Sequence, residues 1–302
     1  MNSRELGQTG VAVPEIGLGT WDYHGGVKPL RAGFERGALF VDTAESYGSE
    51  PVVGEAIRGR RNEIFLATKV SPEHFHRRDI QKAADEGLRR LRTDYIDLYQ
   101  LHQPNSGVPI AETLGAIEDL VEAGKVRFIG VSNFSLAQIK QAQQASRKHP
   151  IAANQVRYSV VDRTIEGGLL QYCQANHVSI IAYSPLSRGL SRTLDCDPEG
   201  VLAEVARAKG KTIAQVALNW CLCKEGVFVI PKGNSVAHVI ENCGASGWRL
   251  DPVHIRMIDE KIKFNRRSGV QMLLRQLVPH SMSGIALRVI QRLPRRLRRR
   301  FS

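Results

Sequence analysis

Four side chains that could take part in proton transfer lie within the first 102 residues: Asp42, Tyr47, Lys69 and His102. Asp42 ends the apolar run ALFVD, where a buried carboxylate is costly unless a cation lies next to it. Lys69 ends the apolar run FLATK and can supply that cation. A tyrosine near a lysine ammonium has its phenolate form favoured, so we expect the pKa of Tyr47 to fall below its reference value of about 10. These residue types predict general acid catalysis with Tyr47 as the acid.

Each of these residues also has a purely structural interpretation. Asp42 could cap a helix, and Lys69 could extend along the surface. His102 could be a core histidine before a proline, and Tyr47 an aromatic residue in a turn. The catalytic interpretation therefore requires a fold that brings all four side chains together.

Eight short apolar segments have the composition of β-strands: residues 15–19, 38–42, 63–69, 95–102, 126–132, 152–156, 179–184 and 227–231. Segments with helical periodicity lie between them, for example residues 77–92, 110–124 and 212–226, the last with Thr212 as a cap and Gly226 as a stop. Strands that are apolar almost throughout favour a parallel sheet covered by helices. Eight such strand and helix units predict an α/β fold, a (β/α)8 TIM barrel. A doubly wound sheet is the alternative, but no GxGxxG follows the first strand.

A barrel would bring the four side chains to one place, because the carboxyl ends of barrel strands converge at a single mouth. Asp42, Lys69 and His102 end three successive predicted strands, and Tyr47 follows the first of the three. We therefore expect Asp42 to pair with Lys69. The opening residues SRELGQTGVAVPEIG predict an N-terminal β-hairpin that plugs the opposite end of the barrel.

Seven motifs, in this order and spacing, closely resemble the aldo-keto reductase superfamily: DTAESYGSE, FLATKV, YQLHQP, FIGVSNF, NQVRYS, AYSPLSRG and IPKGN. The resemblance covers residues 3 to 263 and implies an NADPH-dependent oxidoreductase that reduces an aldehyde or ketone to an alcohol by hydride transfer. It implies that Tyr47 protonates the carbonyl oxygen and that Lys69, held by Asp42, tunes it. His102 then orients the carbonyl and helps in proton transfer.

The resemblance also implies a dinucleotide site that has no Rossmann unit. Ser132, Asn133 and Gln155 match the residues that hydrogen-bond the nicotinamide carboxamide. Tyr183 matches the aromatic residue that stacks on the nicotinamide ring, although a core aromatic is the alternative. The other cofactor contacts that it implies are Thr20, Ser184, Leu186, Gly189, Lys232, Asn234, Glu241 and Asn242. Trp21 matches a wall of the substrate pocket, with packing over the barrel as the alternative.

The segment IPKGNSVAHVIEN bears on the choice between NADPH and NADH. Lys232 and Asn234 match the pattern that holds the adenosine 2′-phosphate, and a lysine suits a phosphate as a point charge. We therefore favour NADPH. His238 departs from the family, because many members carry an arginine there and a histidine with a pKa of about 6.5 is mostly neutral at neutral pH.

The formal charge of +12 belongs to the end of the chain. Residues 266–302 hold ten of the 42 basic residues and no acidic one, so residues 1–265 carry 32 bases against 30 acids. We therefore predict a barrel over residues 1–265 followed by a basic C-terminal tail. In this tail, Ile290, Leu293, Leu297 and Phe301 recur at helical spacing. The tail could be a solvated end or fold over the barrel mouth, lie on an anionic membrane surface, or touch nucleic acid, in that order of preference.

No apolar run is long enough to span a membrane or to act as a signal peptide, so we expect a cytoplasmic location. Cys173, Cys196, Cys221, Cys223 and Cys243 show no paired spacing, which favours reduced thiols packed in helices and no metal site. A monomer is expected by analogy with the family.

Two other functional classes stay open. One is a cofactor-binding regulatory module attached to a partner or a membrane through the basic tail. The other is a lyase or isomerase on the same barrel, which would not need Gln155 or the SPL loop. The identity of the small carbonyl substrate is not set by these residues.

Overall fold

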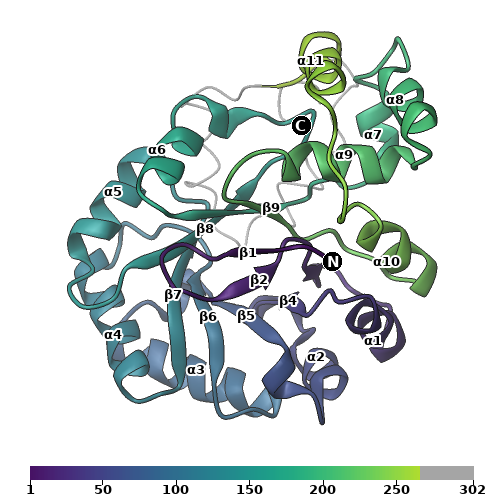
Figure 1. Cartoon of the computed structure of the whole chain (residues 1–302). Helices are drawn as coiled ribbons and strands as arrows, with labels where there is room; N and C mark the ends of the chain where they lie inside the picture. The colour runs from purple at the N-terminus through teal and green to yellow at the C-terminus, as the bar shows by residue number, and fades with distance from the viewer. Residues whose placement is uncertain (266–302) are drawn as a thin grey trace, which may run out of the picture. The chain divides into compact units, whose positions relative to one another are not determined.

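Eight parallel strands form the centre of this computed structural model, which describes residues 1–265 (Figure 1). Each strand pairs with its neighbours in chain order. The strands are β3 Leu18–Gly19, β4 Phe40–Asp42, β5 Phe65–Val70, β6 Ile96–Leu101, β7 Val126–Ser132, β8 Ile151–Arg157, β9 Ser179–Tyr183 and β10 Val227–Val229. Each overlaps one of the eight predicted segments, so the strand prediction is confirmed.

The first and last strands are joined by hydrogen bonds that close the sheet. Ile16 forms a parallel bridge with Val229, and the Gly17 amide donates to the Val229 carbonyl at 2.8 Å. The Gly19 amide donates to the Pro231 carbonyl at 3.2 Å. A side chain at Gly19 would place its Cβ 2.5 Å from the Ile230 carbonyl oxygen, so this approach requires glycine. The predicted (β/α)8 barrel is confirmed.

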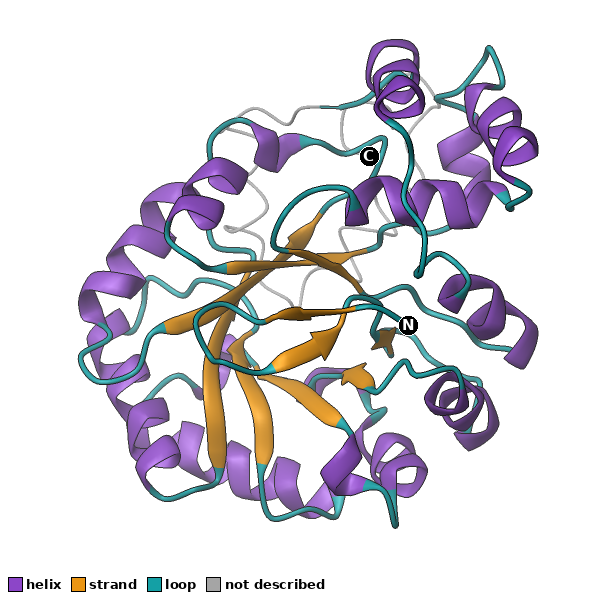
Figure 2. Ribbon diagram, viewed as in Figure 1, coloured by secondary structure: helices purple, strands orange, loops and turns teal. Residues whose placement is uncertain are grey.

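Helices surround the strands (Figure 2). They are α1 Val27–Glu35, α2 Glu50–Ile57, α3 Arg77–Leu91, α4 Ile110–Glu122, α5 Leu136–Ala145, α6 Leu169–Ala175, α7 Leu190–Leu194, α8 Val201–Lys209, α9 Ile213–Leu222, α10 Val236–Cys243 and α11 Pro252–Lys261. Among the helices of residues 1–265, none is long and apolar enough to cross a membrane.

The helices predicted over residues 77–92 and 110–124 are confirmed as α3 and α4. Thr212 caps α9 as predicted, in a capping box with Gln215. The end of α9 was predicted wrongly, because the helix stops at Leu222 and Gly226, with φ 68°, instead forms the turn that leads into β10.

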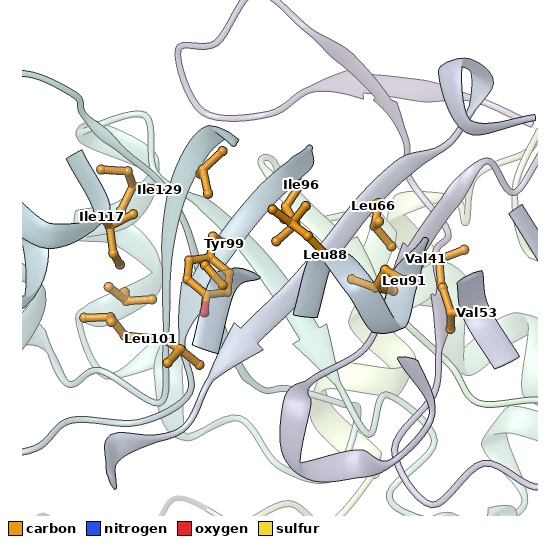
Figure 3. Close-up of a cluster of buried hydrophobic side chains, with 14 of the residues drawn as sticks. Val41, Val53, Leu66, Leu88, Leu91, Ile96, Tyr99, Leu101, Ile117 and Ile129 are labelled. Carbon is orange, nitrogen blue, oxygen red and sulfur yellow. The ribbon is translucent and has the colours of Figure 1, made fainter. Parts of the chain in front are cut away.

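Apolar side chains fill two layers. Between strands and helices, side chains of α3 such as Leu88 and Leu91 pack with Val41, Leu66 and Ile96 of the neighbouring strands (Figure 3). Inside the barrel, a separate cluster of strand residues meets the N-terminal hairpin.

The hairpin consists of β1 Ser3–Glu5 and β2 Ala12–Pro14, paired antiparallel. Leu6 and Val13 are fully buried and pack with Phe40 and Phe228 inside the barrel. Gly7 lies against the Ala152 carbonyl, at the start of β8. The hairpin thus closes the amino-terminal end of the barrel, as predicted.

All five cysteines are free thiols, as predicted. Three lie within helices and two follow helix ends: Cys173 in α6, Cys221 in α9, Cys243 in α10, Cys196 after α7 and Cys223 after α9. Burial raises the pKa of each thiol, so all five stay protonated at neutral pH. The predicted tail, residues 266–302 with its apolar positions, lies outside the described residues.

Leu6→Ala tests the importance of the plug. We expect it to lower the free energy of unfolding by about 2–5 kcal/mol, because it opens a cavity in the barrel interior. Leu194→Ala is the matched control, since Leu194 is 42% exposed and its truncation should change stability by less than about 0.5 kcal/mol. Urea unfolding followed by circular dichroism measures both. Equal small effects would show that the hairpin is not part of the core.

Candidate active site

A buried ion pair lies at the ends of two neighbouring strands. Lys69 Nζ is 2.6 Å from Asp42 Oδ1, and each residue is only 1% exposed. The ammonium also donates to the Thr43 carbonyl at 2.9 Å. Since a buried charge is stable only when it is paired and hydrogen-bonded, each residue requires the other. The predicted pairing of Asp42 with Lys69 is confirmed.

Two glutamines complete the shell of Asp42. Its second oxygen, Oδ2, accepts from Gln155 Nε2 at 2.6 Å and from Gln100 Nε2 at 3.1 Å. Both glutamines are buried and point into the barrel from β8 and β6. Gln100 was not predicted as a site residue. Its signal in the sequence is a single amide within the apolar run IDLYQL, directly before the strand ends.

Tyr47 lies in a short 3-10 helix, η1 Glu45–Tyr47, that follows β4. Gly48, with φ 69°, turns the chain into α2. The Ser49 hydroxyl then ties this turn to the strand ends through the hydroxyls of Thr20 and Thr43, each at 2.9 Å. These contacts hold the backbone at Tyr47 in place relative to the strand ends.

The Tyr47 side chain contacts Lys69 and His102. Lys69 Nζ lies 4.8 Å from the ring centroid, so its charge acts on the phenol and favours the ionised form. The Tyr47 hydroxyl is 3.5 Å from His102 Nε2, and the two rings meet edge to face at 5.4 Å. The barrel therefore brings together the four side chains that lie far apart in sequence.

The predicted fall in the pKa of Tyr47 is wrong. Burial of the phenol raises its pKa above the ordinary value, Lys69 acts to lower it, and Asp42 acts to raise it again. Desolvation outweighs the attraction of the ammonium because the Asp42 carboxylate offsets much of that charge. At neutral pH Tyr47 is thus a neutral phenol, which is the form that a general acid needs.

Lys69 stays charged in the same environment. Burial alone would lower its pKa, but attraction to Asp42 and Tyr47 and hydrogen bonds to both outweigh burial, so that the pKa of Lys69 is raised. The site thus holds a permanent cation beside a protonated phenol.

A second polar group lies at the ends of β7, β8 and β9. Asn133, with φ 62°, follows β7, and its amide donates to the His102 carbonyl and to the Ser132 hydroxyl, each at 3.1 Å. The Tyr183 hydroxyl donates to Asn133 Oδ1 at 2.9 Å. The Ser132 hydroxyl and the Asn133 backbone amide both donate to the carbonyl of Gln155. The residues matched to the nicotinamide thus lie next to the ion pair.

The loop after β9 has an unusual backbone. Ser184, Ser187 and Arg188 all have positive φ, at 49°, 58° and 67°, and Gly189 follows at 138°. Non-glycine residues in this region carry strain of a kind that clusters at ligand clamps. Leu186 lies within this loop, which is the segment matched to the pyrophosphate cover.

The residues matched to the adenosine 2′-phosphate lie near Trp21. Lys232 pairs with Asp22 at 3.0 Å, and its Nζ lies 5.6 Å from the Trp21 ring. The guanidinium of Arg188 lies 5.0 Å from the same ring, which is 48% exposed at the mouth. Asp22 and Arg188, which contact Lys232 and Trp21 from neighbouring loops, were not among the predicted site residues.

Three further matched residues lie around α10. Asn234 Oδ1 accepts from the His24 amide at 3.1 Å, ahead of the helix. Asn242 is 4% exposed on α10, and Glu241 beside it is partly exposed. His238 is exposed in the first turn. Within residues 1–265, no group of three or more His, Cys, Asp or Glu is arranged to hold a metal ion.

Thr20 is the matched residue with the least access to a ligand. It is fully buried, and its hydroxyl donates to the Asp42 carbonyl at 2.9 Å. Its placement as a contact of the cofactor stays a prediction, as do the roles of the other matched residues.

Comparison with known proteins matches residues 15–263 to the model of the Aldo/keto reductase family. Methylglyoxal reductase YeaE of Escherichia coli is 38% identical over 261 residues, covering 83% of this chain and 91% of that protein. Glyoxal reductase of Bacillus subtilis is 32% identical over 263 residues, covering 85% and 92%. Among solved structures, an aldo/keto reductase from Klebsiella pneumoniae in complex with NADP and acetate is 37% identical, with a TM-score of 0.80 over 89% of this chain and 98% of that one.

A double-mutant cycle tests the ion pair. Asp42→Asn should lower the free energy of unfolding by about 3–5 kcal/mol, because it keeps an acceptor near Gln155 but leaves the Lys69 ammonium buried without a counter-charge. Adding Lys69→Met should restore most of this loss, since no buried charge then remains. Urea unfolding of the four proteins measures the coupling. If the double variant lost as much free energy of unfolding as the two single variants together, Lys69 and Asp42 would not be coupled and the ion pair would not be the dominant interaction.

Proposed function

The chain belongs to the aldo/keto reductase family, and from this premise we propose that it uses NADPH to reduce the carbonyl group of a small aldehyde or ketone. The observation that carries the proposal is the meeting of the Tyr47 phenol, the Lys69 cation and the His102 ring beside the Asn133 and Tyr183 pair. Its relatives include a methylglyoxal reductase and a glyoxal reductase, so the chain is an oxidoreductase of this family.

The polar groups at the mouth fit a nicotinamide dinucleotide. A carboxamide needs both donors and acceptors, which Ser132, Asn133 and Gln155 offer together. Tyr183 supplies an aromatic face next to them, and Lys232 supplies a cation for a phosphate. When bound, NADPH supplies the hydride.

The protein's own groups then handle the proton and the orientation of the substrate. Tyr47 donates its phenolic proton to the carbonyl oxygen as negative charge develops there. Lys69 stabilises the phenolate that remains, and Asp42 holds Lys69 in place. His102, in contact with the Tyr47 hydroxyl, directs the carbonyl oxygen toward that proton.

We extend the proposal to 2-oxoaldehydes as the first substrate class to test. The support comes from the names of two relatives, a methylglyoxal reductase and a glyoxal reductase. No observation favours the regulatory module, whose attachment would lie in residues 266–302, or a lyase or isomerase.

The purified full chain should bind NADPH more tightly than NADH and oxidise it when methylglyoxal is added. Quenching of tryptophan fluorescence measures binding, because Trp21 lies 5.6 Å from Lys232. Loss of nicotinamide absorbance measures turnover. Tight binding of NADPH with no oxidation by methylglyoxal or a panel of aldehydes and ketones would contradict the proposed reductase.

Tyr47→Phe should keep NADPH affinity and lower the rate of reduction by about 10²–10⁴-fold, because the proton donor is gone. Tyr172→Phe is the matched control. It also removes one hydroxyl, but Tyr172 lies on α6 and its hydroxyl bonds only to Gln143 among the described residues, so the rate should be unchanged. Full activity of the Tyr47 variant would disprove its role as the acid.

A further inference from the structure

Arg157 is a charged residue at the mouth that the mechanism above does not use. It ends β8 and lies in register with Tyr183, which ends β9. Its guanidinium carbon lies 5.7 Å from the centroid of the Tyr183 ring. Arg157 follows Gln155 by two residues, so both side chains lie on the same side of the sheet. The charge therefore lies beside the ring that we propose as the stacking surface.

This charge has little compensation in the described part of the chain. No carboxylate of residues 1–265 lies within ion-pair distance of Arg157, and its Nε is buried without a hydrogen-bond partner there. It borders a cavity of about 10 Å³, together with the Ser159 and Ser187 hydroxyls and a second cation, Arg192. Such a space holds about one water molecule and no anion.

The other fixed charges near the mouth do not cancel Arg157. Asp162 brings one negative charge to the same cavity, but Arg157 and Arg192 bring two positive charges, so the carboxylate offsets only one of them. Lys69 and Asp42 form a pair whose charges offset each other. The local excess at Tyr183 is thus positive.

We propose that Arg157 makes the cofactor site discriminate between the two redox forms of the nicotinamide, favouring NADPH over NADP⁺. This rests on the proposed function, in which Tyr183 stacks on the nicotinamide ring. The oxidised ring carries a positive charge and the reduced ring carries none. A guanidinium against the stacking tyrosine therefore repels only the oxidised form. The enzyme then binds NADPH more tightly than NADP⁺ and releases NADP⁺ more readily after the reaction.

The size of the effect follows from Coulomb's law. Two unit charges roughly 8–10 Å apart, at an effective dielectric constant of about 20–40, change an equilibrium constant by about 4- to 30-fold. Arg157 should therefore raise the ratio of the NADP⁺ and NADPH dissociation constants by that factor.

The test is to measure both dissociation constants by fluorescence titration for the full chain and its Arg157 variants. Arg157→Met and Arg157→Gln remove the charge, and the second keeps a polar N–H donor. Both should lower the NADP⁺ dissociation constant about 4- to 30-fold relative to that of NADPH. Arg157→Lys keeps the charge and should leave the ratio within about twofold of the wild type. Thermal unfolding confirms that each variant is folded.

Arg192→Met is the matched control. It removes a cation from the same cavity, but Arg192 has no contact with the Tyr183 ring, so the ratio should shift less than in Arg157→Met. Equal changes in both dissociation constants, or a shift in Arg157→Lys as large as in Arg157→Met, would overturn the inference and leave the proposed function intact. Failure of the wild type to bind either form would overturn both.

Discussion

The buried ion pair between Lys69 and Asp42 is the constraint from which the rest of the mouth follows. Two charges that are almost fully removed from water need every remaining hydrogen bond satisfied. Oδ2 of Asp42 therefore draws in amides from β6 and β8, and Lys69 takes the Thr43 carbonyl. One carboxylate thus links four strands of the barrel at the same height. The hydrogen bonds that align these strands are therefore the same ones that hold Lys69 and Asp42 in the site.

The same requirement extends to the loop that carries Tyr47. Ser49 ties the loop to the strand ends, and the next residue, Glu50, is buried at the start of α2. Glu50 accepts from the Thr68 hydroxyl at 2.7 Å and from Arg90 of α3 at 2.6 Å. The phenol is therefore anchored at both ends of its loop, by β4 before it and by α2 after it. A proton donor held in this way needs little reorganisation before reaction.

The sequence was sufficient to predict those features of the structure that depend on one local pattern. Continuous apolar runs located the strands, and a carboxylate and an ammonium ending neighbouring runs identified the ion pair. The sequence was insufficient where several groups compete. The pKa of Tyr47 depends on burial, on Lys69 and on Asp42 together, and only their positions show that burial dominates. Gln100 was missed because a lone amide in an apolar strand does not reveal which carboxylate it meets.

The loops at the mouth show why the remaining residues could not be predicted. Lys232 was predicted to hold a phosphate, yet in this structure it already pairs with Asp22, from a loop 210 residues earlier in the chain. A phosphate at Lys232 would have to displace that carboxylate. Its affinity would therefore depend on how much more strongly Lys232 interacts with the phosphate than with Asp22, and not on the lysine alone. The strained loop at Ser184 to Gly189 presents the same difficulty, because Ser187 contacts Ser159 and Arg188 contacts Trp21, both distant in sequence. The barrel is set by local patterns, while binding at its mouth is set by contacts between loops that only the closed barrel brings together.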